Sequence, residues 1–367
     1  MEQISKPTVA VIGLGLMGGS LAASLSRAGI KVTGWDENPQ SMAEAVKLGA
    51  IAELSPDLDA AVRQAEVIFL ATPVELIAPV MAKCLPLTSP GTVFTDLGSI
   101  KELVINEVKK LLPPTHFFLP GHPMTGAEQH GISAADPFLF QNAAYLLIED
   151  EDTNPKVLAK VASIVKLTGA HLLTLSAKEH DRIVGMVSHL PHLIASVLAR
   201  TAGDAEEEYP GTLNLAAGGF RDTTRIALGD PKLWEGIILG NCFWVKRALE
   251  DFQVELTTLI EILNRNESNA LRDYLGRARE IRVQLPTKNK GFLTLLYEMV
   301  VTIEDKPGTI NNVLQYLAAE NLNIKDIEIL RVREGDGGTL RLALENSIDV
   351  EKAVQLLEAK GFKARKR

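Results

Sequence analysis

The 367-residue chain contains only two cysteines, Cys84 and Cys242, and they lie far apart in the sequence. No CxxC pair and no cysteine–histidine ligand spacing occurs, so we expect two reduced thiols and no metal site. Positive charge is also scarce, because the formal net charge at pH 7 is −8 and the sequence pI is about 5.5. An acidic chain is poorly suited to bind nucleic acid or an anionic membrane surface, so we expect neither partner.

Long apolar runs are lacking as well. No run approaches the roughly 18 residues that a membrane span needs, and the opening "MEQISKPTVAVIG" does not follow the plan of a secretory signal peptide. Hydrophobic residues make up 46% of the chain and charged residues 23%, which is ordinary for a globular protein. We therefore expect a cytoplasmic protein, and its length suggests two or three domains.

The first part of the chain alternates strand-like runs with helical stretches. Six runs have the apolar and β-branched content of buried strands: 8–13, 31–36, 66–73, 91–99, 142–150 and 170–176. Strands that alternate with helices predict a parallel sheet covered on both faces, and the last two runs are expected to extend it. The sequence therefore predicts an α/β domain of the Rossmann type over residues 1–176.

The pattern changes after residue 176. Residues 177–290 show helical apolar spacing and no convincing strand, which predicts an all-α domain. Apolar residues occur almost all round its later helices, so we expect a partner subunit to bury them in a homodimer. Residues 297–367 read as βαββαβ, with "GDGG" at the turn of the hairpin, and predict a ferredoxin-like domain.

A glycine-rich loop, "GLGLMG" at 13–18, follows the first strand and opens a helix. Asp36 ends the second strand about 20 residues later, as in dinucleotide-binding folds. The glycines allow a tight turn, close approach of a pyrophosphate and helix packing, while Asp36 would accept the ribose hydroxyls. No arginine follows in "DENPQ", so we predict NAD rather than NADP. The predicted cofactor residues are Gly13, Gly15, Leu16, Met17, Gly18, Asp36 and Thr72.

Two polar side chains follow later strands of the same predicted sheet. Ser99 lies in "DLGSIK" and His122 in "GHPMTGAE", and ligands of doubly wound sheets bind at this end of the strands. A neutral imidazole can take an alcohol proton while hydride leaves the same carbon. We therefore predict His122 as a general base with Ser99 beside it, and interpret His130 and His180 as turn or cap residues.

The predicted helical domain offers two further motifs. In "SHLPH", His192 shares roughly one helix face with Ser188 and with Asp181. In "GGFRDTTRIA", Arg221 and Arg225 are four residues apart. Arginine suits bidentate binding of a carboxylate, so this pair indicates either a local anion site or a surface salt-bridge pair.

These motifs together resemble the prephenate dehydrogenase family, and the resemblance covers nearly the whole chain. "VIGLGLMGGSLA", "DLGSIK", "GHPMTGAE", "SHLPH" and "GGFRDTTRIA" occur in the family's order and approximate spacing. The tail "VTIEDKPGTINNVLQYLAAENLNI" resembles an ACT domain, an amino-acid-sensing ferredoxin-like unit. The resemblance implies NAD-dependent oxidative decarboxylation of prephenate to 4-hydroxyphenylpyruvate, and a dimer formed by the helical domain.

The resemblance also implies roles for individual residues. His122 would accept the proton of the ring hydroxyl, and Ser99 would hydrogen-bond that histidine and the hydroxyl. Arg225 would bind a substrate carboxylate, and His192 would lie close to the substrate. Glu128 and Asp222 would form an ionic set with Arg225. The tail would bind L-tyrosine at the turn formed by Pro307 and Gly308, and would inhibit the enzyme.

Alternatives stay open at this stage. An arogenate dehydrogenase would differ only in an amino group on the substrate side chain. A β-hydroxyacid dehydrogenase would carry lysine four residues after a glycine of the second domain, whereas Gly185 is followed there by His189. A non-catalytic regulator that binds NAD and an amino acid would not need Ser99, His122 and Arg225 together. The role of Arg221 is left undecided.

Overall fold

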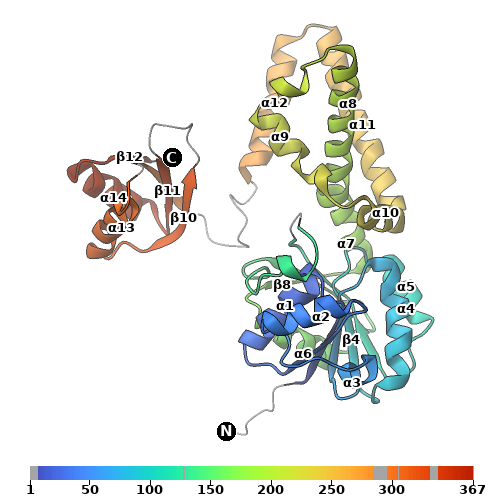
Figure 1. The fold of residues 1–367 in the computed structure, drawn as a ribbon. Helices are drawn as coiled ribbons and strands as arrows, with labels where there is room; N and C mark the ends of the chain where they lie inside the picture. The colour runs from blue at the N-terminus through green and yellow to red at the C-terminus, as the bar shows by residue number, and fades with distance from the viewer. Residues whose placement is uncertain (1–6, 127–128, 285–295, 305, 331–337, 367) are drawn as a thin grey trace. The chain divides into compact units, whose positions relative to one another are not determined.

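The computed structural model describes residues 7–126, 129–284, 296–304, 306–330 and 338–366. The chain divides into two compact units, one that ends at Arg277 and one that begins at Ala278 (Figure 1). Each unit has its own core and is described by itself.

The first unit is built on a five-stranded parallel sheet in the order β2-β1-β3-β4-β5. Its strands are β1 (Val9–Ile12), β2 (Val32–Trp35), β3 (Val67–Leu70), β4 (Val93–Asp96) and β5 (Phe117–Leu119). β1, β3 and β4 are buried along their whole length, as expected for parallel strands covered on both faces. The strand order reverses between β1 and β3, and that switch point is where doubly wound sheets bind ligands.

Helices cover both faces of this sheet. They are α1 (Leu16–Arg27), α2 (Pro39–Lys47), α3 (Leu58–Val62), α4 (Val74–Cys84), α5 (Glu102–Lys109) and α6 (Pro155–Lys166). Val9 and Val11 pack into a core with α1, α2 and α6, whereas Ala10 and Ile12 pack into a second core with α3, α4 and α5. The period of two along a strand therefore divides one short segment between two cores.

A second sheet of three strands adjoins the first. β6 (Gly121–Pro123) pairs antiparallel with β7 (Ala144–Ile148), which pairs parallel with β8 (His171–Leu175). The prediction that 142–150 and 170–176 extend the parallel sheet was wrong, since they form this separate sheet with β6. The sequence "GHP" gave no strand signal, because glycine and proline are poor strand formers. Pro120 ends β5 and turns the chain into β6.

Between residue 177 and residue 284 the described chain is helical. Its α-helices are α7 (Ala177–Val184), α8 (Leu190–Glu208), α9 (Gly218–Thr224), α10 (Pro231–Gly240), α11 (Cys242–Asn264) and α12 (Ser268–Gln284). A π-helical turn, η3 (Gly185–His189), joins α7 to α8 immediately before Pro191. α10 contacts α4 and sends Ile237 into its core, which docks the helices on the nucleotide-binding part.

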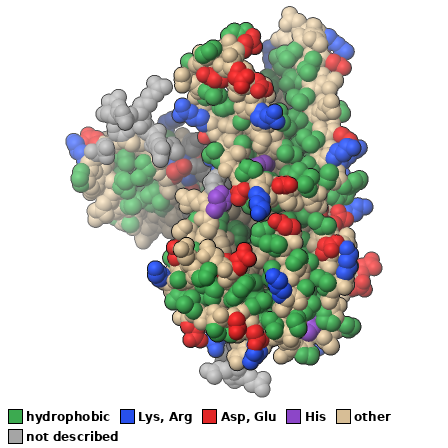
Figure 2. All heavy atoms as spheres, turned by 45° about the vertical axis from the view of Figure 1, so that its right-hand side comes forward, with side chains coloured by type: hydrophobic (Ala, Val, Ile, Leu, Met, Phe, Trp, Pro, Cys, Tyr) green, Lys and Arg blue, Asp and Glu red, His purple; other side chains and the backbone are tan. Residues whose placement is uncertain are grey.

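The helical run Ala177–Glu208 is long and apolar enough to cross a membrane by length and composition, with 33% of its apolar window buried. This differs from the expectation that no run approaches that length. A core helix of a soluble protein meets the same criterion. Many apolar side chains of the helices face outward, and Figure 2 shows them along the upper part of the molecule.

The second unit is a βαββαβ sandwich of one sheet and two helices. Its elements are β9 (Tyr297–Ile303), α13 (Thr309–Ala319), β10 (Ile324–Leu330), β11 (Gly338–Leu344), α14 (Ser347–Ala359) and β12 (Lys363–Lys366). The antiparallel sheet has the order β10-β11-β9-β12, which confirms the ferredoxin-like prediction. The residues of the predicted hairpin turn before Gly338 lie outside the described part of the chain.

Arg341 on β11 ties three strands of this sheet together. Its side chain is 2% exposed and forms ion pairs with Glu298 of β9 at 2.6 Å and with Asp326 and Glu328 of β10 at 2.5 and 2.7 Å. A buried guanidinium requires such partners, because an unpaired charge would carry a large desolvation cost. The arrangement therefore fixes the strand register on this face.

Candidate active site

The glycine loop has the shape of a dinucleotide cradle. Gly13 adopts φ +94°, and a Cβ atom there would lie 2.6 Å from the carbonyl oxygen of Ala71. A Cβ atom on Gly18 would lie 1.8 Å from the carbonyl oxygen of Gly13, whereas one on Gly15 would have no neighbour within 4 Å. The loop is therefore closed where the helix packs and open at Gly15, and α1 begins there without a side-chain cap. Its free N–H groups fit a phosphate.

Asp36 and Thr72 flank this loop. The carboxylate of Asp36 accepts hydrogen bonds from the backbone N–H of Leu14 at 2.7 Å and of Asn38 at 2.8 Å, which ties the loop to the end of β2. The buried hydroxyl of Thr72 finds no partner among the described residues, although its side chain adjoins Gly13. A buried polar atom without a partner is costly, so it fits a polar ligand. Leu16 and Met17 are half-buried in the first turn of α1.

His122 lies on β6 and is buried, with a relative exposure of 8%. Its Nδ1 atom lies 2.8 Å from Nε2 of His180, and the two rings meet edge to face. Nδ1 of His180 in turn lies 2.7 Å from Oδ1 of Asp181. His180 and Asp181 belong to α7 and are almost completely buried. The three side chains therefore form a continuous buried relay.

The relay fixes the position of the ring protons. The ionised carboxylate of Asp181 can only accept, so Nδ1 of His180 must donate to it. In a neutral His180 ring, Nε2 is then an acceptor, and Nδ1 of His122 must donate to it. A neutral His122 consequently carries its lone pair on Nε2. This is the tautomer that a general base needs.

The carboxylate of Asp181 is held by more than the histidine. It accepts hydrogen bonds from the backbone N–H groups of Lys101 at 2.7 Å and Glu102 at 2.8 Å, at the start of α5. The side-chain amide of Asn241 donates to the backbone carbonyl of Asp181 at 2.8 Å and lies 3.2 Å from Nδ1 of His189. The relay is therefore anchored both to the nucleotide-binding part and to the helices.

The surroundings keep the histidines uncharged at neutral pH. Burial lowers the pKa of His122 well below its usual value, and the positive charge that His180, Lys101 and His189 carry when protonated lowers it further. Burial also lowers the pKa of His180, against the opposing effect of Asp181. The pKa of His189 falls to about 4, chiefly through burial. His122 therefore has a free lone pair at neutral pH, as the sequence prediction of a base requires.

Ser99 occupies the loop between β4 and α5 and is half-buried. β4 and β6 contact each other, so the loop with Ser99 and the strand with His122 are neighbours. The Nδ1 atom of His122 pairs with His180 rather than with Ser99. The expected hydrogen bond between Ser99 and His122 therefore stays a prediction.

His192 stacks on Trp234, with ring centroids 3.6 Å apart and 14° between the planes. His192 is 7% exposed, and its Nδ1 atom has no hydrogen-bond partner among the described residues. Burial lowers its pKa. Trp234 also meets the edge of His189, which links this stack to the network around Asp181. An aromatic pair with one unsatisfied nitrogen fits the wall of a polar ligand site.

The predicted anion site lies on α9 and the short helix η5 (Arg225–Leu228), which contacts α8. Arg221, Asp222 and Arg225 are all exposed. Glu128, the fourth member of the expected ionic set, lies outside the described residues. The ionic set therefore stays a prediction.

Sequence reasoning missed several members of this network. The sequence alone favours a turn or cap role for His180 and predicts no role for Lys101, Asn241, His189 or Trp234. His180 and Asp181 stand side by side in "KEHDRIVG", but their partner lies 58 residues away. A local pattern could not reveal that pairing.

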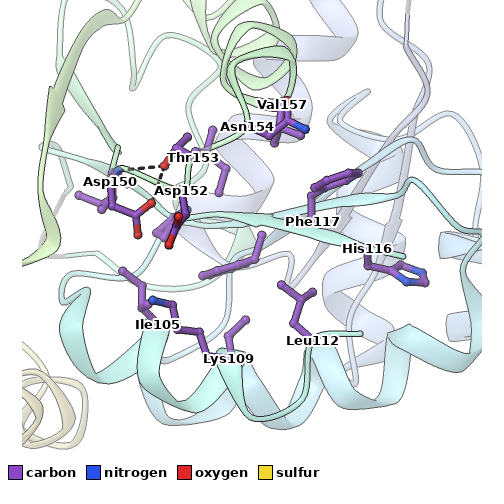
Figure 3. Close-up of a pocket in the computed structure, with 15 residues that line it drawn as sticks. Ile105, Lys109, Leu112, His116, Phe117, Asp150, Asp152, Thr153, Asn154 and Val157 are labelled. Atoms are coloured by element: carbon purple, nitrogen blue, oxygen red, sulfur yellow. Dashed lines mark hydrogen bonds between the residues drawn. The ribbon is translucent and has the colours of Figure 1, made fainter. Parts of the chain in front are cut away.

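A separate cleft of about 350 Å³ lies between α5 and the segment that joins β7 to α6 (Figure 3). Its lining includes the apolar side chains of Ile105 and Leu112 on one side and Phe117 on another, while Asp150 and Asp152 stand together. None of the predicted catalytic or substrate-binding residues lines it. We therefore place the candidate active site at the relay rather than in this cleft.

Comparison with known families covers both units. Residues 21–174 match the family description "Prephenate dehydrogenase, nucleotide-binding domain". Residues 176–277 match "Prephenate dehydrogenase, dimerization domain", and residues 297–362 match "ACT domain".

Individual relatives agree with these matches. The chain is 32% identical to a prephenate dehydrogenase of Bacillus subtilis, over 97% of this chain and 96% of the relative. It is 31% identical to the crystal structure of Aquifex aeolicus prephenate dehydrogenase in complex with hydroxyphenyl propionate and NAD⁺, with a TM-score of 0.70 over 78% of this chain and all of that one. Synechocystis arogenate dehydrogenase is also 31% identical, with a TM-score of 0.67 over 76% of this chain and all of that one.

Proposed function

Because the chain belongs to the prephenate dehydrogenase family, we propose that it oxidises prephenate with NAD and releases 4-hydroxyphenylpyruvate, carbon dioxide and NADH. The relay from His122 through His180 to Asp181 is the observation that carries this proposal. It supplies a neutral base whose lone pair stands on a defined nitrogen. Aromatisation of the ring drives the reaction, so the protein needs a base, a bound cofactor and a carboxylate clamp.

The cofactor residues fit NAD. Gly13 and Gly18 close the loop and Gly15 leaves room for the pyrophosphate, which the first N–H groups of α1 would bind. Each oxygen of Asp36 already accepts one backbone hydrogen bond and can accept a second from a ribose hydroxyl. The same carboxylate would repel the 2′-phosphate of NADP. When bound, NAD supplies the acceptor for the hydride of the carbinol carbon.

Nε2 of His122 accepts the proton of the hydroxyl group on the substrate ring. As the proton arrives, positive charge develops on His122 and is stabilised through His180 by the carboxylate of Asp181. Ser99 orients the hydroxyl, and loss of the ring carboxylate follows. The relay that holds the base is buried.

Arg225 clamps a substrate carboxylate, since a guanidinium binds carboxylates in a bidentate manner. His192 lies close to the substrate and offers its unsatisfied Nδ1 atom. We propose that Asp222 and Glu128, which lies outside the described residues, form an ionic set with Arg225. Arg221, on the preceding helix α9, is not assigned a role.

The direct test measures NADH formation at 340 nm with prephenate, arogenate and a β-hydroxyacid in parallel, each with NAD and with NADP. We expect turnover with prephenate and NAD and poor use of NADP. Preference for arogenate would support the alternative that the Synechocystis relative favours. Turnover of the β-hydroxyacid alone would refute the assignment, and absence of any turnover would support a non-catalytic sensor.

Regulation and assembly complete the proposal. We assign residues 1–176 to the NAD-binding domain, 177–290 to a substrate and dimerisation domain, and 297–367 to an ACT domain that binds L-tyrosine and inhibits the enzyme. Exposed apolar side chains on the helices, Leu239 at 65% and Phe243 at 73% among them, support a homodimer. Two free cysteines are consistent with a cytoplasmic protein.

A further inference from the structure

Lys101 is a fully buried lysine that the proposed reaction does not use. Both Lys101 and Asp96 have side-chain exposures of 0%, and they form an ion pair. The ammonium group of Lys101 also donates to the backbone carbonyl of Gly121 at 2.7 Å. Such a pair is costly to bury, and an apolar pair of similar volume often stabilises a protein equally well. Stability alone therefore does not account for it.

The pair joins the two segments that carry the site. Asp96 ends β4 and accepts hydrogen bonds from the N–H of Gly98 at 2.9 Å and of Gly121 at 3.2 Å. Gly121, the residue immediately before His122, therefore donates its N–H to Asp96 and accepts at its carbonyl from Lys101. Ser99 lies between the two members of the ion pair in sequence, so its loop is closed on itself and fixed to β6.

The backbone of Lys101 reaches the other end of the relay. Its N–H donates to Oδ1 of Asp181, the same oxygen that His180 contacts. One residue thus holds the peptide group before His122 with its ammonium group and the terminal carboxylate of the relay with its N–H.

We propose that Lys101 is a positioning residue for the reaction assigned above: its ammonium group fixes the Ser99 loop against the strand of His122, so that both side chains meet one substrate hydroxyl. This inference rests on the proposed function for its kinetic consequences, while its geometry does not depend on the substrate.

The charge of Lys101 adds an electrostatic consequence. Lys101 is one of the groups that lower the pKa of His122. The titratable groups around His122 and the adjoining Gly121 are His180 and Asp181 from α7, His189 from η3, Asp96 and Lys101 from the β4–α5 loop, and Tyr145 from β7. Removing the ammonium group leaves Asp96 negative, and both changes raise the pKa of His122. The base would then be protonated at a higher pH.

The test uses Lys101→Met in the full-length protein. We expect kcat with prephenate to fall about 10- to 100-fold, the scale that misplacement of catalytic groups produces, while KM for NAD changes by less than about twofold. The acid limb of the kcat profile should move to higher pH. Lys109→Met removes the same charge from an exposed position of α5 and should behave as the wild type.

A second variant guards against misfolding. Asp96→Asn/Lys101→Met leaves no unbalanced buried charge, so we expect a Tm close to that of the wild type with kcat still reduced, because Gly121 has lost its donor. Wild-type kcat in a folded double variant would overturn the proposal. The proposal would also be overturned if both variants lost kcat, NAD binding and Tm in parallel while the acid limb of the kcat profile stayed in place. Lys101 would then have a purely structural role.

Histidine NMR separates this inference from the proposed function. The imidazole signals of the substrate-free protein are titrated, with His122→Asn used to assign the His122 signal. We expect His122 to titrate at higher pH in Lys101→Met than in the wild type, whichever substrate the protein oxidises. An unchanged titration overturns the electrostatic part, whereas a wild type that oxidises no substrate tested refutes only the proposed function.

Discussion

Nδ1 of His122 and Nε2 of His180 lie 2.8 Å apart, and Asp181 engages the opposite nitrogen of His180 at 2.7 Å. Hydrogen-bond donation therefore runs in one direction, from His122 to His180 and from His180 to the carboxylate. Asp181 cannot stabilise the base by direct contact, because His180 stands between them. The ring of His180 sets the tautomer of His122 and lets the carboxylate of Asp181 stabilise a positive charge on His122 from a distance.

The first prediction concerns the base itself. His122→Asn should lower kcat by about two to four orders of magnitude, the usual range for a positioned acid–base group, with little change in NAD affinity. In the wild type, log kcat should fall with unit slope as the pH drops through the pKa of His122. Because burial lowers that pKa, the acid limb should lie below pH 6.5, the ordinary value for histidine.

Steady-state kinetics with prephenate across pH, with NAD binding followed by fluorescence, check this prediction. A variant with near wild-type kcat would return "GHPMTGAE" to the interpretation of a turn. An acid limb above the ordinary histidine value would contradict the lowered pKa.

The second prediction concerns the far end of the relay. In the wild type, the two carboxylate oxygens of Asp181 accept hydrogen bonds from His180, Lys101 and Glu102. Asp181→Asn replaces one of these oxygens with an amide NH₂ group. The amide can donate to His180, which would reverse both tautomers and leave a proton on Nε2 of His122. A comparable carboxylate-to-amide change in a serine protease costs about 10⁴-fold in kcat, and we expect a loss of about 10²- to 10⁴-fold here.

Tm should also fall, because one N–H at the start of α5 loses its acceptor. Asp152→Asn, an exposed carboxylate beside the separate cleft, is the matched control and should retain full activity. If Asp181→Asn kept kcat within a few-fold of the wild type while its Tm fell, Asp181 would be a helix cap only.

How far the sequence predicts this arrangement depends on the range of the interactions. The cradle at Gly13–Gly18 was predictable because its loop geometry is encoded within about 24 residues, up to Asp36. His122 and Ser99 were predictable as strand-end residues, since the alternation of strands and helices places strand ends together. These signals are local in the chain.

The remaining parts depend on packing. "GHP" forms β6 by pairing with β7, where Leu146 stands opposite His122, although its own propensity points away from a strand. His180 is one of several polar residues on α7, and only the docking of that helix against β6 selects it. The stack of His192 on Trp234 joins α8 to α10 across 42 residues, and no helical spacing indicates it.

The third prediction concerns the carboxylate clamp. Arg225→Ala should raise KM for prephenate by tens-fold or more and leave KM for NAD nearly unchanged, because truncating one partner of a charged pair weakens only that contact. Arg221→Ala on the adjoining helix α9 is the matched control, and a smaller effect there would settle which arginine binds substrate. Equal effects of Arg225→Ala on both substrates would indicate a structural salt bridge.

The last prediction concerns the second unit. Gly308 caps α13 in the left-handed region at φ +89°, and as a glycine it supplies no side-chain cap to the helix start. Such a helix start can receive a carboxylate. L-tyrosine should therefore inhibit the full chain. Prephenate should in turn weaken tyrosine binding by the same factor by which tyrosine weakens prephenate binding, because coupling between two binding sites is reciprocal.

Gly308→Ala tests this in the intact protein. A Cβ atom there meets no neighbour within 4 Å. The substitution should therefore destabilise the protein only through the strained backbone, by about 1–2 kcal/mol, and should change the turn rather than the core. We expect weaker inhibition by tyrosine with unchanged kcat in its absence. A truncation ending near residue 290 should lose inhibition altogether. Inhibition that persists unchanged in both proteins would place tyrosine at the active site as a product-like competitor, and the regulatory role of the second unit would be wrong.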